Sequence, residues 1–216
     1  MSRRLPSKPQ QASPRKSGKR GAPTRVQIIL AGVGGQGVLF ATRVFSQMAM
    51  AKGFPVIGSE THGMSQRGGS VVSHLKLGQF NSPLIGRGTA DIVYSFEKNE
   101  SYRSLHFLKG ATGKGQGGLC FINAPDEGFM EAQISTYLME RGAGVYVLAA
   151  DAIARELGSP LSSNLVLIGF SSAHPSFPFQ YDDLKETVRT VSPSRFREAN
   201  LVVLERGYQE GKRRKW

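Results

Sequence analysis

The chain has only one cysteine, Cys120, among its 216 residues. A single thiol cannot form an internal disulfide and cannot hold an iron–sulfur cluster alone, so any such centre must lie on a partner. No uninterrupted apolar stretch approaches the roughly 20 residues that span a bilayer, and we expect no membrane partner. These absences predict a soluble chain without a metal centre, in a reducing intracellular compartment, which we take to be the cytoplasm.

Acidic residues are almost absent from both ends of the chain. Residues 1–25 carry eight basic residues and no acid, and residues 206–216 carry five basic residues and one acid. The formal net charge of +12 therefore arises at the ends, because the stretch between them has 15 charges of each sign. Charge blocks at chain ends are usually disordered. We expect a disordered basic tail over 1–25, a folded domain over 26–207 and a basic C-terminal tail over 208–216.

The first segment is unlike a targeting sequence. It has few apolar residues besides Leu5 and Ala12, and its prolines would interrupt an amphipathic helix, so neither a signal sequence nor a transit helix fits. Nucleic acid is not an expected partner either, since a neutral domain without a recognised reader module leaves only tail-driven, sequence-blind binding. A tail-mediated nucleic-acid-binding protein stays as a minor alternative.

Strand and helix patterns alternate along the rest of the chain. An apolar run at 26–31 predicts a buried strand, and after GVGGQG a helical pattern runs from Val38 to Gly53, before a second strand at 54–58. Further strands are expected at 71–77, 91–96, 119–123 and 145–149, and helices at 100–108, 129–141, 152–157, 162–171, 182–191 and 195–207. The pattern predicts an α/β, Rossmann-like fold, with a mostly parallel sheet flanked by helices and a helical C-terminal part.

The glycine-rich turn after the first strand has the spacing of a phosphate-binding loop. Gly32, Gly34 and Gly37 match GxGxxG between a predicted strand and a predicted helix, and the same turn contains Gly35 and Gln36. Such a turn lets a ligand approach the backbone and offers amide groups to an anion. It also lets a helix cross closely over the sheet, so both interpretations stand. A second match at 113–118 precedes a strand and is interpreted as a flexible loop.

A nicotinamide dinucleotide would require an acid at the end of the second strand to hold its ribose. Glu60 stands near that position, although the residues after it do not resemble an adenosine pocket. A free-standing NAD(P)-dependent oxidoreductase is therefore an alternative hypothesis.

The segment Glu60–Ser70, ETHGMSQRGGS, gathers polar and charged groups among three glycines. Loops outside the carboxyl edge of a sheet are where α/β folds place ligands. His62 suits general acid–base chemistry or a hydrogen bond to backbone, and Arg67 suits an anion clamp or a pair with Glu60. We take His62 and Arg67 as candidate catalytic residues, and Glu60, Gln66 and the glycine turn as candidate cofactor-binding residues.

Three motifs occur in order and carry a resemblance to a known family. They are GVGGQG, then HGMSQRGG, and then an acidic pattern made by Asp91, Glu97, Glu100 and Arg103. Over about 26–103, and more weakly over 154–169, the chain resembles the gamma subunit, or gamma domain, of the 2-oxoacid:ferredoxin oxidoreductases. The form HGMSQRGG is similar to the arylpyruvate branch, in which the corresponding chain is the small subunit of the indolepyruvate:ferredoxin oxidoreductases.

The resemblance implies a subunit of a complex that oxidatively decarboxylates a 2-oxo acid, with indolepyruvate or another arylpyruvate as the expected substrate. In that family thiamine diphosphate and 4Fe-4S clusters belong to a large partner subunit, coenzyme A is the co-substrate and ferredoxin accepts the electrons. The chain would hold none of these cofactors alone and would be inactive without the large subunit. Its glycine turn and the Glu60–Ser70 loop would lie near the partner's active site.

Overall fold

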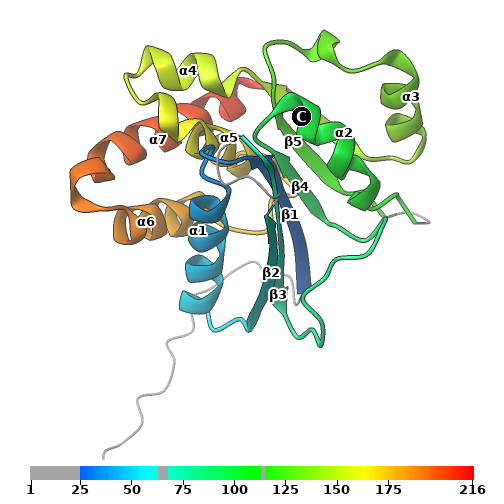
Figure 1. Ribbon diagram of the computed structural model, residues 1–216, viewed down its shortest axis with the longest axis horizontal. Helices are drawn as coiled ribbons and strands as arrows, with labels where there is room; N and C mark the ends of the chain where they lie inside the picture. Colours follow the sequence, from blue (N-terminus) through cyan, green and yellow to red (C-terminus); the bar gives the residue numbers. More distant parts are fainter. Residues whose placement is uncertain (1–24, 63–67, 113–114) are drawn as a thin grey trace, which may run out of the picture.

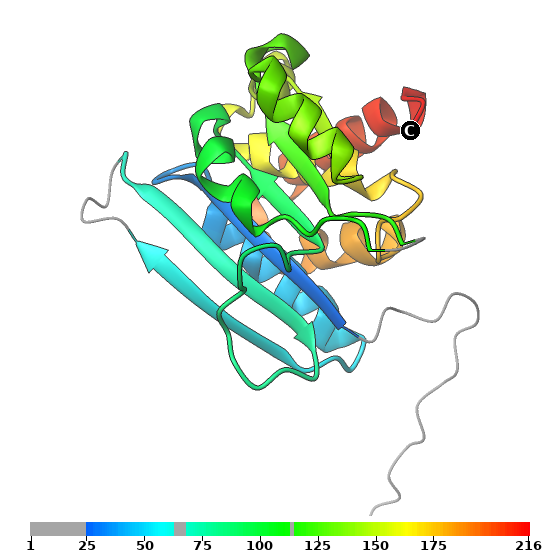
Figure 2. The same ribbon diagram turned by 90° about the vertical axis from the view of Figure 1, so that its right-hand side faces the viewer.

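The computed structural model describes residues 25–62, 68–112 and 115–216, and it shows a six-stranded sheet between two layers of helices (Figures 1 and 2). In chain order the strands are β1 (Arg25–Val33), β2 (Val56–His62), β3 (Ser70–Gly78), β4 (Ile92–Ser95), β5 (Leu119–Asn123) and β6 (Gly144–Leu148). Their spatial order is β2-β3-β1-β4-β5-β6, and only β3 runs against the others. The predicted mostly parallel sheet is therefore confirmed. The N-terminal tail predicted over 1–25 lies outside the described residues, except for Arg25.

The helices divide between the two faces of the sheet. One face carries α1 (Val38–Ala51), α5 (Ser163–Ser172), α6 (Tyr181–Val191) and α7 (Arg197–Arg213), with α4 (Ala150–Glu156) near their upper end in Figure 1. The other face carries α2 (Lys98–Ser104) and α3 (Ala132–Glu140). Short 3-10 turns are η1 (Leu105–Phe107), η2 (Glu127–Phe129), η3 (Pro160–Ser162) and η4 (Ser194–Phe196). None of the helices in the described ranges is long and apolar enough to cross a membrane.

The apolar core has two parts, one on each face of the sheet. Ile28 and Leu30 of β1 point into the larger part, under the helices of the first face, and Ile29 points into the smaller part on the other face. All three side chains are fully buried. A strand buried on both faces needs an uninterrupted apolar run, which is the pattern that predicted β1.

β1 and β2 run parallel, as the strand–helix–strand unit predicts, but they are not neighbours. β3 lies between them, and Val71 of β3 pairs with Gly32 on one side and with His62 on the other. Two strand spacings amount to roughly 10 Å. Residues at the end of β2 are therefore kept away from the glycine turn that follows β1.

The structure differs from the expectation of a basic C-terminal tail over 208–216. α7 continues through Arg213, and the ring of Trp216 packs against Tyr146 and Phe170, with ring centroids 5.0 and 5.1 Å apart. Arg214 donates a hydrogen bond to the carbonyl oxygen of Val147, 3.4 Å away, on the outer strand of the sheet. The basic side chains that suggested a tail belong to a helix end whose other side is packed against the domain.

Candidate site at the carboxyl edge of the sheet

The sequence-predicted residues that the structure describes lie along one edge of the sheet. The glycine turn 32–37 begins in the last two residues of β1 and leads into α1, while Glu60 and His62 belong to the last three residues of β2. From β1 the chain crosses to β2, toward one edge strand of the sheet, whereas from β4 it crosses to β5, toward the opposite edge strand. Such a switch point is where open α/β sheets place their ligands. The side chain of His62, together with Gln66 and Arg67, lies outside what the structure describes.

The backbone amides of the glycine turn are largely used within the protein. The N–H of Val33 donates to Oε1 of Gln36 at 2.9 Å, and the N–H of Gln36 donates to the carbonyl oxygen of Val33 at 3.1 Å. The N–H of Gly34 donates to the carbonyl oxygen of Gly69 at 2.9 Å. At Gly32 a Cβ atom would lie 2.9 Å from Oε1 of Gln36, so the folded-back side chain needs a glycine there. Three amides of this segment therefore bond within the protein, two of them to the turn itself and one to Gly69.

The last glycine of the turn allows a close approach between α1 and α5. Gly37 has a positive φ of 75°, and its carbonyl oxygen accepts a hydrogen bond from Nδ2 of Asn164 at 3.0 Å. A Cβ atom at Gly37 would collide with that same Nδ2 atom. Gly35, at the exposed tip, also has a positive φ, of 102°, with open space around it. Of the two interpretations of the turn, the geometry favours close packing of a helix.

The acidic motif in α2 holds the start of β3. Glu97 caps the helix by accepting hydrogen bonds from the N–H groups of Asn99 and Glu100, at 2.7 and 3.1 Å. Glu100 is 3% exposed, and its carboxylate accepts hydrogen bonds from Ser70 at 2.6 Å and from Arg103 at 2.9 Å. Ser70 directly follows Gly69, whose carbonyl oxygen accepts the hydrogen bond from Gly34. The network therefore links α2, the start of β3 and the glycine turn at this edge of the sheet.

Asp91 stands apart from the rest of that motif. It precedes β4 and lies at the opposite edge of the sheet, where its carboxylate accepts a hydrogen bond from the N–H of Gln27 at 2.9 Å. Lys109 lies 3.5 Å from the other carboxylate oxygen of Asp91. This first member of the motif therefore joins two strand starts and takes no part in the candidate site.

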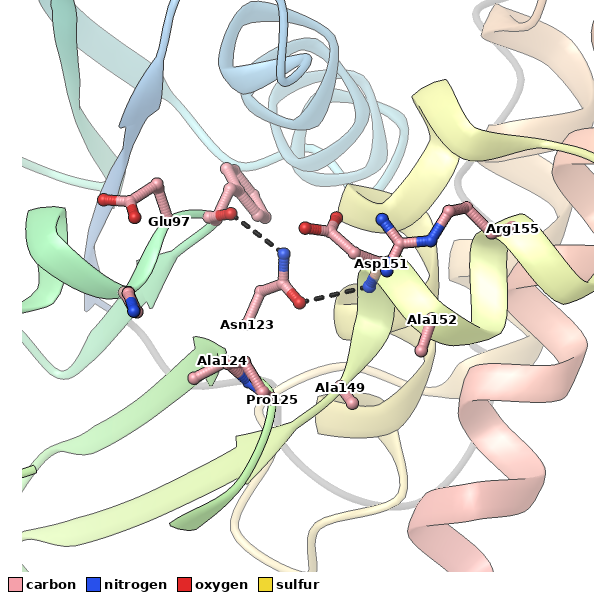
Figure 3. Close-up of a pocket in the computed structure, with 10 residues that line it drawn as sticks. Glu97, Asn123, Ala124, Pro125, Ala149, Asp151, Ala152 and Arg155 are labelled. Atoms are coloured by element: carbon pink, nitrogen blue, oxygen red, sulfur yellow. Dashed lines mark hydrogen bonds between the residues drawn. The ribbon is translucent and has the colours of Figure 1, made fainter. Parts of the chain in front are cut away.

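A cavity of about 320 Å³ opens at the carboxyl ends of β4, β5 and β6 (Figure 3). Asn123 is buried in its wall, where its Nδ2 donates to the carbonyl oxygen of Phe96 at 3.0 Å and its Oδ1 accepts from the N–H of Asp151 at 3.1 Å. Figure 3 shows Asp151 and Arg155 on the α4 side of the cavity and Glu97 across from them. The cavity is suited to the polar part of a ligand.

Sequence reasoning missed Asn123, Asp151 and Arg155. Asn123 ends one predicted strand, and Asp151 follows another. Because parallel strands bring their carboxyl ends to the same edge of a sheet, these two residues could have been predicted to lie there. Arg155 stands one helical turn after Asp151 and shares its face of α4. Their proximity to Glu97 depends on the order of strands in the sheet.

The described residues offer little chemistry of their own. Cys120 is fully buried in β5, and burial raises the pKa of its thiol to about 12, so the reactive thiolate is suppressed. In the described ranges, no group of three or more histidine, cysteine, aspartate or glutamate side chains is arranged to hold a metal ion.

These features define a Rossmann-like α/β domain without the dinucleotide-binding arrangement. Glu60 is separated from β1 by the intervening strand β3, so it does not stand beside the glycine turn as a ribose-binding acid would. The free-standing NAD(P)-dependent hypothesis is therefore not favoured.

The chain belongs to the pyruvate ferredoxin/flavodoxin oxidoreductase family, whose model matches residues 27–210. The family resemblance inferred from the three motifs is thereby confirmed. The chain is 33% identical over 198 residues to indolepyruvate oxidoreductase subunit IorB of Thermococcus kodakarensis, covering 86% of this chain and 95% of that protein. It is 33% identical over 197 residues to the subunit of the same name from Archaeoglobus fulgidus, with the same two coverages.

Solved structures share the fold at lower identity. The gamma subunit of keto/oxoacid ferredoxin oxidoreductase from Geobacter sulfurreducens has a TM-score of 0.63 and 18% identity, covering 87% of this chain and 98% of that one. A 2-oxoglutarate:ferredoxin oxidoreductase from Magnetococcus marinus has a TM-score of 0.69 and 19% identity, covering 89% of this chain but 32% of that longer chain. The predicted α/β architecture with a helical C-terminal part is that of these proteins.

Proposed function

We propose that the chain is the small subunit of an indolepyruvate:ferredoxin oxidoreductase. The observation that carries the proposal is the 33% identity, over 86% of the chain, to archaeal subunits of indolepyruvate oxidoreductase. A larger subunit would carry thiamine diphosphate and the 4Fe-4S clusters. The single, buried cysteine of the small subunit supports this division, because one thiol cannot supply the ligands of a cluster.

The complex would convert indolepyruvate or another arylpyruvate, coenzyme A and oxidised ferredoxin into an acyl-coenzyme A, carbon dioxide and reduced ferredoxin. Thiamine diphosphate supplies the carbanion chemistry of the decarboxylation when it is bound to the larger subunit. The carbon–carbon bond to the carboxylate would break, the acyl group would pass to the sulfur of coenzyme A as its thiol proton is released to solvent, and the two electrons would pass through the clusters to ferredoxin. We expect the assembled enzyme in the cytoplasm.

The contribution of this chain would be a rigid edge that faces the larger subunit. Glu60 and the backbone of His62 stand at the end of β2, and β3 begins at Ser70, which the buried carboxylate of Glu100 holds. His62, Gln66 and Arg67 would act near the partner's active site. A site flanked by well-packed strand ends is held in position better than one on a loose loop.

Co-purification and reconstitution test the proposal. The full chain is produced with and without the cluster-bearing large subunit from the same source, under anaerobic conditions, and ferredoxin reduction is measured with indolepyruvate and coenzyme A. We expect a colourless, inactive chain alone and substrate-dependent reduction by the complex. Decarboxylation of arylpyruvates by the isolated chain, or heat of binding with NAD or NADP, would contradict the assignment.

A further inference from the structure

A second hollow, an apolar groove of about 430 Å³, lies where α1, α5 and α7 begin. Its lining comes from Gly37 and Phe40 at the start of α1, from η3 and the start of α5, and from η4 and the start of α7. Figure 1 shows the three helices on the same side of the sheet. The groove is thus a meeting point of three helix ends rather than a gap within the core.

Two large apolar side chains of this lining are left in water. Leu161 in η3 is 81% exposed, and Phe196 in η4 is 48% exposed. Isolated exposed apolar residues are common, but two that line one apolar hollow indicate an interaction surface.

The groove adjoins the candidate site. Gly37, in its wall, is also the last residue of the glycine turn, and Asn164 in the same wall donates the hydrogen bond to the carbonyl oxygen of Gly37. A partner that covers the carboxyl edge would therefore reach the groove without leaving the surface of this chain.

Three occupants of the groove are possible: the chain's own N-terminal segment, a second copy of the chain, or the larger subunit. The charged residues in the segments that form the groove distinguish between them. The segments 37–43, 158–165 and 193–200 carry Arg43, Arg195 and Arg197 against one acid, Glu198. The guanidinium of Arg195 lies 4.5 Å from the ring centroid of Phe196.

The excess of basic residues in these segments disfavours the chain's own N-terminal segment as the occupant. That segment carries seven basic residues and no acid over 1–24, and it joins the domain at Arg25, at the amino end of β1, opposite the edge where α1 begins. The same excess disfavours the equivalent surface of a second copy, which would bring like charges together. A partner with carboxylates beside its apolar side chains fits the position of Arg195 next to Phe196.

We propose that this groove receives apolar side chains of the larger subunit, from a segment flanked by acidic residues. The inference rests on the proposed function, because it requires that larger subunit. Leu161 and Phe196 would form the apolar contact, and Arg195 would lie at the charged margin.

The test measures binding of full-length variants to the purified large subunit. Leu161→Asp should raise the dissociation constant by about 30-fold or more, the size expected when an anchor in an apolar pocket is lost. Met139→Asp is the matched control, because Met139 is 74% exposed on α3 at the opposite face, and it should change the constant by less than about threefold. Arg195→Glu should weaken binding at low salt, with a smaller effect at high salt.

Each outcome separates the inference from the proposed function. If the wild-type chain does not bind the large subunit, the proposed function fails before any variant is compared. If it binds and Leu161→Asp binds equally well, only the groove assignment is overturned. Light scattering that shows a homodimer lost in Leu161→Asp, with large-subunit binding unchanged, would assign the groove to a second copy. The variant Leu161→Cys is labelled chemically with and without residues 1–24. If the deletion increases the labelling, the groove would be assigned to the N-terminal segment.

Discussion

Replacing Gly207 by alanine should push α5 and α7 apart and lower the free energy of unfolding. A Cβ atom at Gly207 would stand 2.0 Å from the carbonyl oxygen of Val166, and one at Gly169 would stand 2.1 Å from that of Leu204. Both distances are far inside van der Waals contact. Because the obstructing atoms belong to the backbone of a buried helix, they cannot rotate away, and the helices themselves must move.

The magnitude follows from two opposing terms. Alanine is favoured over glycine inside a helix by about 1 kcal/mol, which stabilises the variant. Overpacking of a core costs about 1–3 kcal/mol and more where backbone must shift, which places Gly207→Ala beyond the upper end of that range. We expect a net loss of at least about 2 kcal/mol, or a fall in melting temperature of at least about 4–8 °C for a domain of this size.

Thermal and urea denaturation followed by circular dichroism measure the effect. Gly86→Ala is the matched control, because a Cβ there would meet its nearest atom, Oγ1 of Thr89, at 3.8 Å, an ordinary contact. The control should stay within about 1 kcal/mol of the wild type. Equal stabilities for Gly207→Ala and Gly86→Ala would refute the argument that the crossing needs glycine.

Three other perturbations test the site, the C-terminus and the pH response. Glu100→Gln removes the charge of its ion pair with Arg103, and it should reduce kcat/KM of the assembled enzyme by about tenfold with little change in melting temperature. An unchanged kcat/KM would contradict the role of this network. Trp216→Ala removes a ring packed on β6 and α5. It should lower the free energy of unfolding, measured by urea denaturation, by about 2–3 kcal/mol. A loss below about 0.5 kcal/mol would mean that the C-terminal segment does not anchor the domain. Burial lowers the pKa of His174 from its usual 6.5, so the unfolded chain takes up this proton first as the pH falls. Stability should therefore decline below about pH 6.5, and less steeply in His174→Gln; equal declines in both proteins would rule out this histidine as a cause.

Local sequence patterns predicted most elements well. The apolar run Leu119–Asn123 is β5 residue for residue, and the helix predicted from Val38 begins there as α1. Where the prediction failed, charge misled it: the basic residues after Gly207 concealed a helix whose other side is packed. Charge describes the exposed side of an element and says nothing about its buried side.

The candidate site was predicted only in part. The motifs placed it at the carboxyl ends of β1 and β2, but they did not reveal the cavity beside Asn123 or the groove beside Leu161. Both hollows are formed by segments far apart in the chain, whose meeting no short pattern records.

Short sequence patterns established the family, the succession of strands and helices and the turn after β1, because motifs and apolar periodicity act over a few residues. The contacts between distant segments emerged only from the fold: β3 enters between β1 and β2, Glu100 holds Ser70 across 30 residues, and Asn164 reaches Gly37 across 127. A backbone amide or a glycine has no fixed role until packing brings its partner to it. The same GxGxxG spacing that accompanies a bound phosphate in dinucleotide-binding folds here serves helix packing, because the carbonyl oxygen of Gly37 accepts a hydrogen bond from Asn164 of α5.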